Sequence, residues 1–255
     1  MKVLFAGPSL SGLDKSEIAT FCRILPPAAQ GDIARAVLEG ATVIGLIDGV
    51  YETTAAVWHK EILYALQQGV TVIGGASMGA LRAAECAAFG MRAVGRIARR
   101  YLDGELDDDA AVAVVHGPAE LDYLPLNEAL VDAEATIGHL ETIGLVSPEE
   151  AGALLASARA LFFKRRTAET IVAGAAVDAA RRAAILEAYA TGHQASKRAD
   201  ALDVVAEVCR RPDALAPAIP GWTLAEPAFW KAALREISAT PAADVARPSM
   251  LAADL

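Results

Sequence analysis

The segment with the clearest chemical potential is Gly-Ala-Ser-Met-Gly at residues 75–79, which matches the pattern GxSxG. An apolar run at 70–74 precedes it and predicts a strand, and residues 80–89 predict a helix, the setting that such a serine needs. A nucleophile on this kind of turn, here Ser77, is pushed out of the packed layer, and the helix start stabilises developing negative charge. The Met78 N–H is the expected oxyanion donor. The plainer alternative is a small-residue turn that only packs a strand against a helix.

A serine nucleophile needs a base, and the residues offer two candidates. His116 follows the acidic run 107–109, so a Ser-Asp-His set can be written, although His116 could equally end a strand. Lys60, beside His59 in the segment Trp-His-Lys-Glu-Ile-Leu at 58–63, serves only if it is neutral. Burial or a position in the first turn of a helix lowers a lysine pKa and would allow Lys60 to act as a base. The plainer alternative is a charged lysine on the surface. The residues alone leave both bases open.

Further polar groups are expected at the same edge of the fold. Gly7 and Ser9 follow the first predicted strand and Asp48 ends the second, and the carboxyl ends of parallel strands are where ligands bind. We expect these residues to bind substrate or an oxyanion. Arg82, on the helix after Ser77, is expected either to hold a substrate carboxylate or to pair with Glu85 three residues on.

Strand and helix patterns alternate in the first half of the chain, and this predicts an α/β fold with a mostly parallel sheet flanked by helices. The second half predicts only helices, so we expect an α/β core at 1–120 and a helical, partner-binding region at 121–255. The predicted strands are 2–6, 42–48, 70–74 and 110–116. The predicted helices are 32–39, one within 53–68, 80–89, 127–143, 151–163, 167–191 and 195–210.

Composition excludes several classes of function. The net charge of −9 leaves too little basic surface for a general nucleic-acid binder. No apolar run reaches the ~18 residues of a membrane span, and none resembles a signal peptide. The three cysteines form no CxxC pair and the four histidines have no metal-ligand spacing. We therefore expect a cytoplasmic protein without a metal site.

In order along the chain, several segments resemble the TfuA family over about residues 1–120. They are Gly-Pro-Ser-Leu at 7–10, Pro-Pro at 26–27 with Gly-Asp at 31–32, Ile-Asp-Gly at 47–49, 57–63, 75–85, Phe-Gly-Met at 89–91 and 111–116. The resemblance implies a partner of YcaO enzymes, which use ATP to activate a backbone amide during the biosynthesis of thioamide-containing peptide natural products. It implies hydrolysis of the thiocarboxylate on a ThiS-like sulfur carrier, which releases sulfide for the YcaO reaction.

The resemblance also implies a Ser–Lys pair, which on this sequence is Ser77 as nucleophile and Lys60 as base. We expect His59 and His116 to be accessory residues of the same site. The resemblance implies no cofactor, since ATP would be bound by the YcaO partner, and only indirect contact with the precursor peptide. Two other functions stay open: a non-catalytic adaptor of YcaO, and a generic serine hydrolase of small esters that depends on His116.

Overall fold

The computed structural model describes residues 1–50, 52, 54–217 and 221–239. Five parallel strands form one sheet in the order β2-β1-β3-β4-β5. The strands are β1 (Lys2–Phe5), β2 (Arg23–Leu25), β3 (Val43–Leu46), β4 (Thr71–Gly74) and β5 (Arg92–Ala93). The predicted α/β fold with a parallel sheet is confirmed, and β2 and β5 are additions at the two edges. Both are too short for their apolar pattern to stand out in the sequence.

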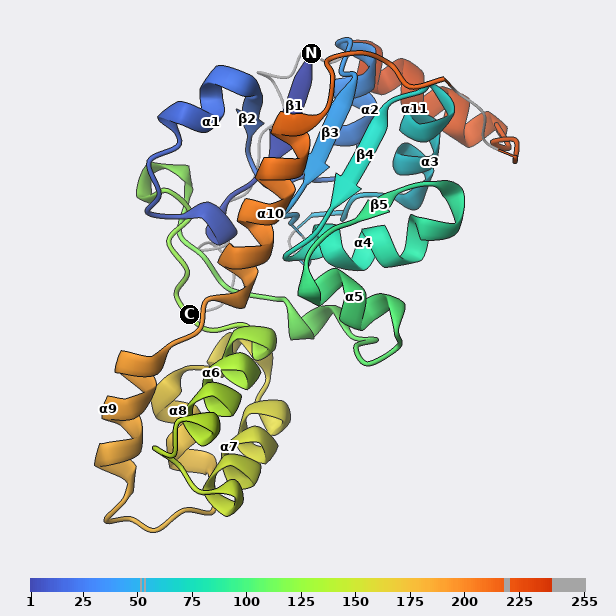
Figure 1. Cartoon of the computed structure of the whole chain (residues 1–255). Helices are drawn as coiled ribbons and strands as arrows, with labels where there is room; N and C mark the ends of the chain where they lie inside the picture. The colour runs from blue at the N-terminus through green and yellow to red at the C-terminus, as the bar shows by residue number, and fades with distance from the viewer. Residues whose placement is uncertain (51, 53, 218–220, 240–255) are drawn as a thin grey trace.

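Alternating side chains of the central strands divide the core into two halves. Val3, Phe5 and Val72 pack with one set of helices, whereas Leu4 and Ile73 pack with the other. The first set is α2 (Asp32–Leu38), α3 (His59–Gln67) and α4 (Met78–Cys86), and the second is α1 (Ser16–Phe21) and α10 (Ser196–Arg210). Helix α5 (Arg96–Leu102) extends the layer of α4. The sheet is thus covered on both faces, as Figure 1 shows, which is why its strands read as continuous apolar runs.

The strand order places a reversal at the centre of the sheet. The chain leaves β1 toward β2 on one side and leaves β3 toward β4 on the other, so the loops after β1 and β3 diverge. Open parallel sheets bind ligands at this divergence, beyond the carboxyl ends of the strands. The loop after β1 contains a short 3₁₀ helix (Pro8–Leu10), and Ser77 follows β4 at the same edge.

Four helices form a separate lobe below the carboxyl edge of the sheet (Figure 1). They are α6 (Leu130–Thr142), α7 (Pro148–Ala160), α8 (Ala168–Gly174) and α9 (Arg182–Gly192), and they enclose an apolar core of their own. Ser147 and Glu150 cap the start of α7 reciprocally. The chain then returns to the sheet through α10, and α11 (Ala228–Ala239) packs on α2. The division near residue 120 stays a prediction.

Two predictions of secondary structure were wrong. Residues 110–116 form no strand: a 3₁₀ helix (Asp109–Ala111) is followed by extended chain with an isolated antiparallel bridge between His116 and Pro125. The Val115 N–H donates to a side chain there and not to a neighbouring strand, since Asn127 Oδ1 accepts it at 2.6 Å. The helix predicted over 167–191 is two helices, α8 and α9. Between them Asp178 forms a local turn, in which its Oδ1 accepts the Ala180 N–H at 3.0 Å.

Candidate functional site

Ser77 lies on a strained turn between β4 and α4. Ala76 has a φ of 66°, and the Ser77 N–H donates to the Gly75 carbonyl at 2.8 Å, which closes a three-residue turn of a rare type. Helix α4 begins at the next residue, so the Met78 N–H has no acceptor within the helix. Ser77 is buried, and its hydroxyl is 3.5 Å from the Val112 carbonyl oxygen. These features are those of a positioned nucleophile beside one oxyanion donor.

The glycines that flank Ser77 are required by close backbone approach. A Cβ on Gly79 would overlap the Leu46 carbonyl at the end of β3, and a Cβ on Gly75 would overlap the Val94 carbonyl. The Gly79 N–H also donates to the Ile47 carbonyl at 3.1 Å, which fastens the start of α4 to the neighbouring strand. The turn is therefore wedged between β3 and the chain after β5, and the serine has little freedom to move.

Asp48 organises the loop after β1. It is almost fully buried, and its Oδ2 accepts the Gly7 N–H at 2.9 Å and the Ser9 N–H at 3.1 Å. Its Oδ1 accepts the Ser9 hydroxyl at 2.7 Å. The predicted site residues Gly7, Ser9 and Asp48 are thus brought together at one sheet edge. Because both amides donate to Asp48, Met78 is the better placed oxyanion donor.

Sequence reasoning missed Lys197, which is the second residue of α10. Its side chain is buried, and Nζ donates to the Val112 carbonyl oxygen at 2.7 Å, the same atom that the Ser77 hydroxyl approaches. Burial lowers the pKa of Lys197, while the negative charges of Asp48 and Asp132 act in the opposite direction. A buried amine with a lowered pKa near a serine hydroxyl is suited to general-base chemistry. No local signal marked it, because the stretch Ser-Lys-Arg-Ala-Asp reads as a solvated helix start.

A small cavity of about 20 Å³ collects Ser77, His116 and Asp109, with Asp48 and Met78 also in its wall. The Nδ1 of His116 is 2.8 Å from the Gly117 carbonyl oxygen, which can only accept, so Nδ1 carries the proton and Nε2 is the acceptor in a neutral ring. Burial raises the pKa of Asp109, and neighbouring Asp108 raises it further. The second predicted base therefore shares the cavity with Ser77.

Lys60 is placed differently. It lies in the first turn of α3, as the Ser–Lys hypothesis required, but its Nζ donates to the Ala225 carbonyl. Within the described ranges, Lys60 is not among the residues that line the cavity of Ser77. The pairing of Ser77 with Lys60 stays a prediction, and no contact in this part of the chain supports it.

His59 and Arg82 meet at Glu85. His59 Nε2 is 2.8 Å and Arg82 Nη1 is 2.6 Å from Glu85 Oε2, and Arg82 Nε donates to the Val57 carbonyl at 3.0 Å. The alternative expectation for Arg82, a pair with Glu85, is the arrangement observed. These contacts fasten the start of α3 to α4.

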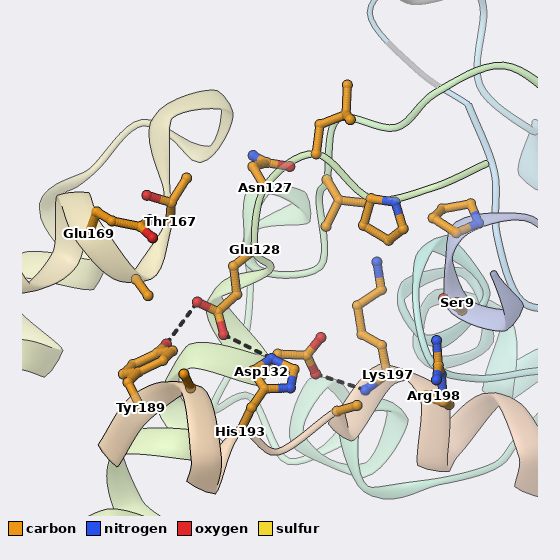
Figure 2. A pocket seen from close by; sticks show the side chains of 17 residues that line it. Ser9, Asn127, Glu128, Asp132, Thr167, Glu169, Tyr189, His193, Lys197 and Arg198 are labelled. Atoms are coloured by element: carbon orange, nitrogen blue, oxygen red, sulfur yellow. Dashed lines mark hydrogen bonds and ion pairs between the residues drawn. The ribbon is translucent and has the colours of Figure 1, made fainter. Parts of the chain in front are cut away.

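A larger cavity of about 520 Å³ adjoins the Ser77 cavity, since Pro8 and Val114 line both. Figure 2 shows its wall, in which Lys197 and Ser9 face Glu128, Asp132, Tyr189 and His193 from the helical lobe. It lies between the sheet edge and the helical lobe and has room for a substrate chain. The small cavity has room for about one water molecule, whereas the large cavity has room for a larger group.

Over the residues that the structure describes, no three of the side chains that commonly bind metals gather in one place. None of the described helices combines the length and apolar character that crossing a bilayer requires.

The strand order defines a doubly wound α/β protein with cavities where its loops diverge, which is the usual place of a ligand site in such folds. Residues 48–167 match the family described as TfuA-like protein. The predicted relationship to the TfuA family is therefore confirmed over this region, which includes Ser77, Lys60 and Val112 but not Lys197. No curated protein matches the chain.

Proposed function

We propose that this protein hydrolyses the thiocarboxylate of a ThiS-like sulfur carrier and releases sulfide for a YcaO enzyme that makes peptide thioamides. The observation that carries the proposal is the approach of the Ser77 hydroxyl and the Lys197 amine to one carbonyl oxygen, that of Val112. The proposal keeps the Ser–Lys chemistry that the TfuA resemblance implies. It assigns the base to Lys197 in place of Lys60, because burial disfavours the charged form of the Lys197 amine.

The reaction balances with groups from the two adjoining cavities, since Ser77 and Met78 line the small cavity and Lys197 lines the large one. Neutral Lys197 takes the proton of Ser77, and Oγ forms a bond to the thiocarboxylate carbon while the Met78 N–H stabilises the oxyanion. The Lys197 ammonium then returns the proton to sulfur, the C–S bond breaks, and hydrosulfide leaves. Water, deprotonated by Lys197, attacks the acyl-serine ester; the Lys197 ammonium then returns the proton to Ser77 Oγ as the C–O bond breaks, and the carboxylic acid product leaves and ionises to a carboxylate. No cofactor takes part in these steps.

Sulfide release from a thiocarboxylated ThiS-like carrier, measured colorimetrically, tests the proposal. Ser77→Ala should lower the rate by at least ~10³-fold, the order expected for loss of a nucleophile. Ser157→Ala is a matched control, because Ser157 is also buried and donates to a carbonyl, that of Ile171 at 2.7 Å. Sulfide release by Ser77→Ala at the rate of the control would refute the proposal.

The same variant separates catalysis from the role of an adaptor. In a complete reaction with YcaO, ATP, precursor peptide and carrier, Ser77→Ala should form almost no thioamide, and free sulfide should restore the product. Full thioamide formation without added sulfide would instead favour a non-catalytic adaptor that binds the YcaO enzyme.

A generic serine hydrolase is the second candidate, because His116 and Asp109 line the same cavity as Ser77. Under this alternative, His116→Gln should abolish turnover of a simple ester such as p-nitrophenyl acetate, and Lys197→Met should leave it intact. The reverse pattern, with the carrier as substrate, favours the Ser–Lys reaction.

A further inference from the structure

The connection between α9 and α10 is tied to α6 by side chains of the helical lobe. Asp132 Oδ1 accepts the backbone N–H of Lys197 at 2.9 Å, and Thr136 Oγ1 accepts the Gln194 N–H at 2.9 Å. His193 Nε2 is 3.3 Å from Glu128 Oε1. Figure 2 shows this contact and the contact between Asp132 and Lys197. The first turn of α10 therefore takes its position from the helical lobe, although the body of α10 packs on the sheet.

Asp132 does more than accept a backbone N–H. Asp132 is half-buried; burial raises its pKa while the positive charge of Lys197 lowers it, and the negative charges of Asp48 and then Asp132 raise the pKa of Lys197. The other charged groups that line the two cavities are Asp48 after β3, Asp109 and His116 in the small cavity, Glu128, Glu169 and His193 in the helical lobe, and Arg198 on α10. Asp132 is the member of this set that both accepts the Lys197 backbone N–H and raises the pKa of Lys197 through its charge.

We propose that Asp132 is a positioning residue that holds the Lys197 amine beside Ser77 and, through its charge, makes that amine a stronger base. The inference rests on the proposed function only for the role of Lys197. It makes the helical lobe part of the active site, since α6 supplies the group that orients the base. A shift of α6 relative to the sheet would then change the reaction rate without moving the nucleophile.

Asp132→Asn tests the electrostatic part, because asparagine retains an oxygen that can accept the Lys197 N–H while it removes the charge. The acid limb of the pH profile of kcat/KM should move to lower pH, because the negative charge that favours the Lys197 ammonium is lost. The plateau of kcat should fall ~10-fold because the base is weaker, with KM little changed. Asp203→Asn, an exposed change on α10, the helix of Lys197, should leave the pH profile unchanged. An unmoved acid limb in a folded Asp132→Asn protein would overturn the inference.

Asp132→Glu is the conservative variant and restores the charge in a longer side chain. It should return the acid limb to its original pH while kcat stays low, because the backbone of Lys197 is no longer held at the same place. A purely structural role for Asp132 predicts instead that neither variant moves the limb.

A second measurement does not depend on activity. In protein labelled with ¹³C at lysine Cε, the NMR titration of Lys197, assigned with Lys197→Met, should have a lower midpoint in Asp132→Asn than in the parent protein. An equal midpoint contradicts the inference. If the midpoint moves but Ser77→Ala retains full sulfide release, the coupling of Asp132 to Lys197 stands and the proposed function fails.

Discussion

The first turns of α3 and α10 resemble each other, but the lysines that they contain lie in different surroundings. Lys60 and Lys197 are both second residues of a helix, where the helix dipole disfavours a positive charge on either one. Lys60 is only partly buried and donates to a carbonyl of the later loop, whereas Lys197 is enclosed between the sheet edge and the helical lobe. Under the proposed function, the difference teaches that exclusion of water, and not position at a helix start, makes a lysine a base.

The largest expected effect separates the two lysines by activity. Lys197→Met should lower sulfide release ~10²–10⁴-fold, the range for loss of a general base. Lys60→Met, the matched change at the other helix start, should alter the rate less than ~2-fold. Initial rates at saturating carrier measure both. A reversed order, with Lys60→Met inactive, would restore the pairing of Ser77 with Lys60 and break the comparison.

A smaller effect is expected from the buried acid of the α3 start. Glu61 Oε1 accepts the Trp58 N–H at 3.2 Å and Oε2 accepts the Ala34 N–H at 3.3 Å, and burial raises the pKa of Glu61 to about 7. The folded state thus binds this proton more tightly than the unfolded chain does. The resulting stability is complete below pH 4.5, the ordinary value, and is lost as the pH rises through about 7.

The free energy of unfolding should accordingly fall by about 1–3 kcal/mol between pH 5 and pH 8 on account of Glu61. Urea titrations at several pH values measure this slope. Glu61→Gln should remove most of it, whereas Glu141→Gln, an exposed change on α6, should not. An unchanged slope in Glu61→Gln would show that the α3 start contains no strongly perturbed acid.

The smallest effect concerns the contact of Lys60. If Lys60 is only a tether for the segment around Ala225, Lys60→Met should lower the free energy of unfolding by about 0.5–1 kcal/mol, the net value of one hydrogen bond. Lys60→Arg retains donors and should lie closer to the parent protein. Denaturant midpoints measure the difference. A loss of several kcal/mol in the free energy of unfolding would mean that Lys60 stabilises the fold by more than this one hydrogen bond.

The central strands and most helices could be predicted because their signals are local. Apolar runs such as 42–48 and 70–74 mark strands covered on both faces, and the Ser147–Glu150 cap marks the start of α7. The segment 110–116 misled the prediction for a physical reason. Residues 111–113 are buried between the lobes and not in a sheet, and an apolar run indicates burial without showing what covers it.

By itself, the sequence determined the α/β class and the Gly-Ala-Ser-Met-Gly turn, since each depends on residues close together in the chain, whereas the crowding that requires glycine around Ser77 comes from the distant carbonyls of Leu46 and Val94. The sequence also carried the resemblance to the TfuA family. Only the tertiary structure decided which lysine lies near Ser77. That choice depends on burial between α10, α6 and the sheet edge, and burial of a charge is a property of packing that adjacent residues do not encode.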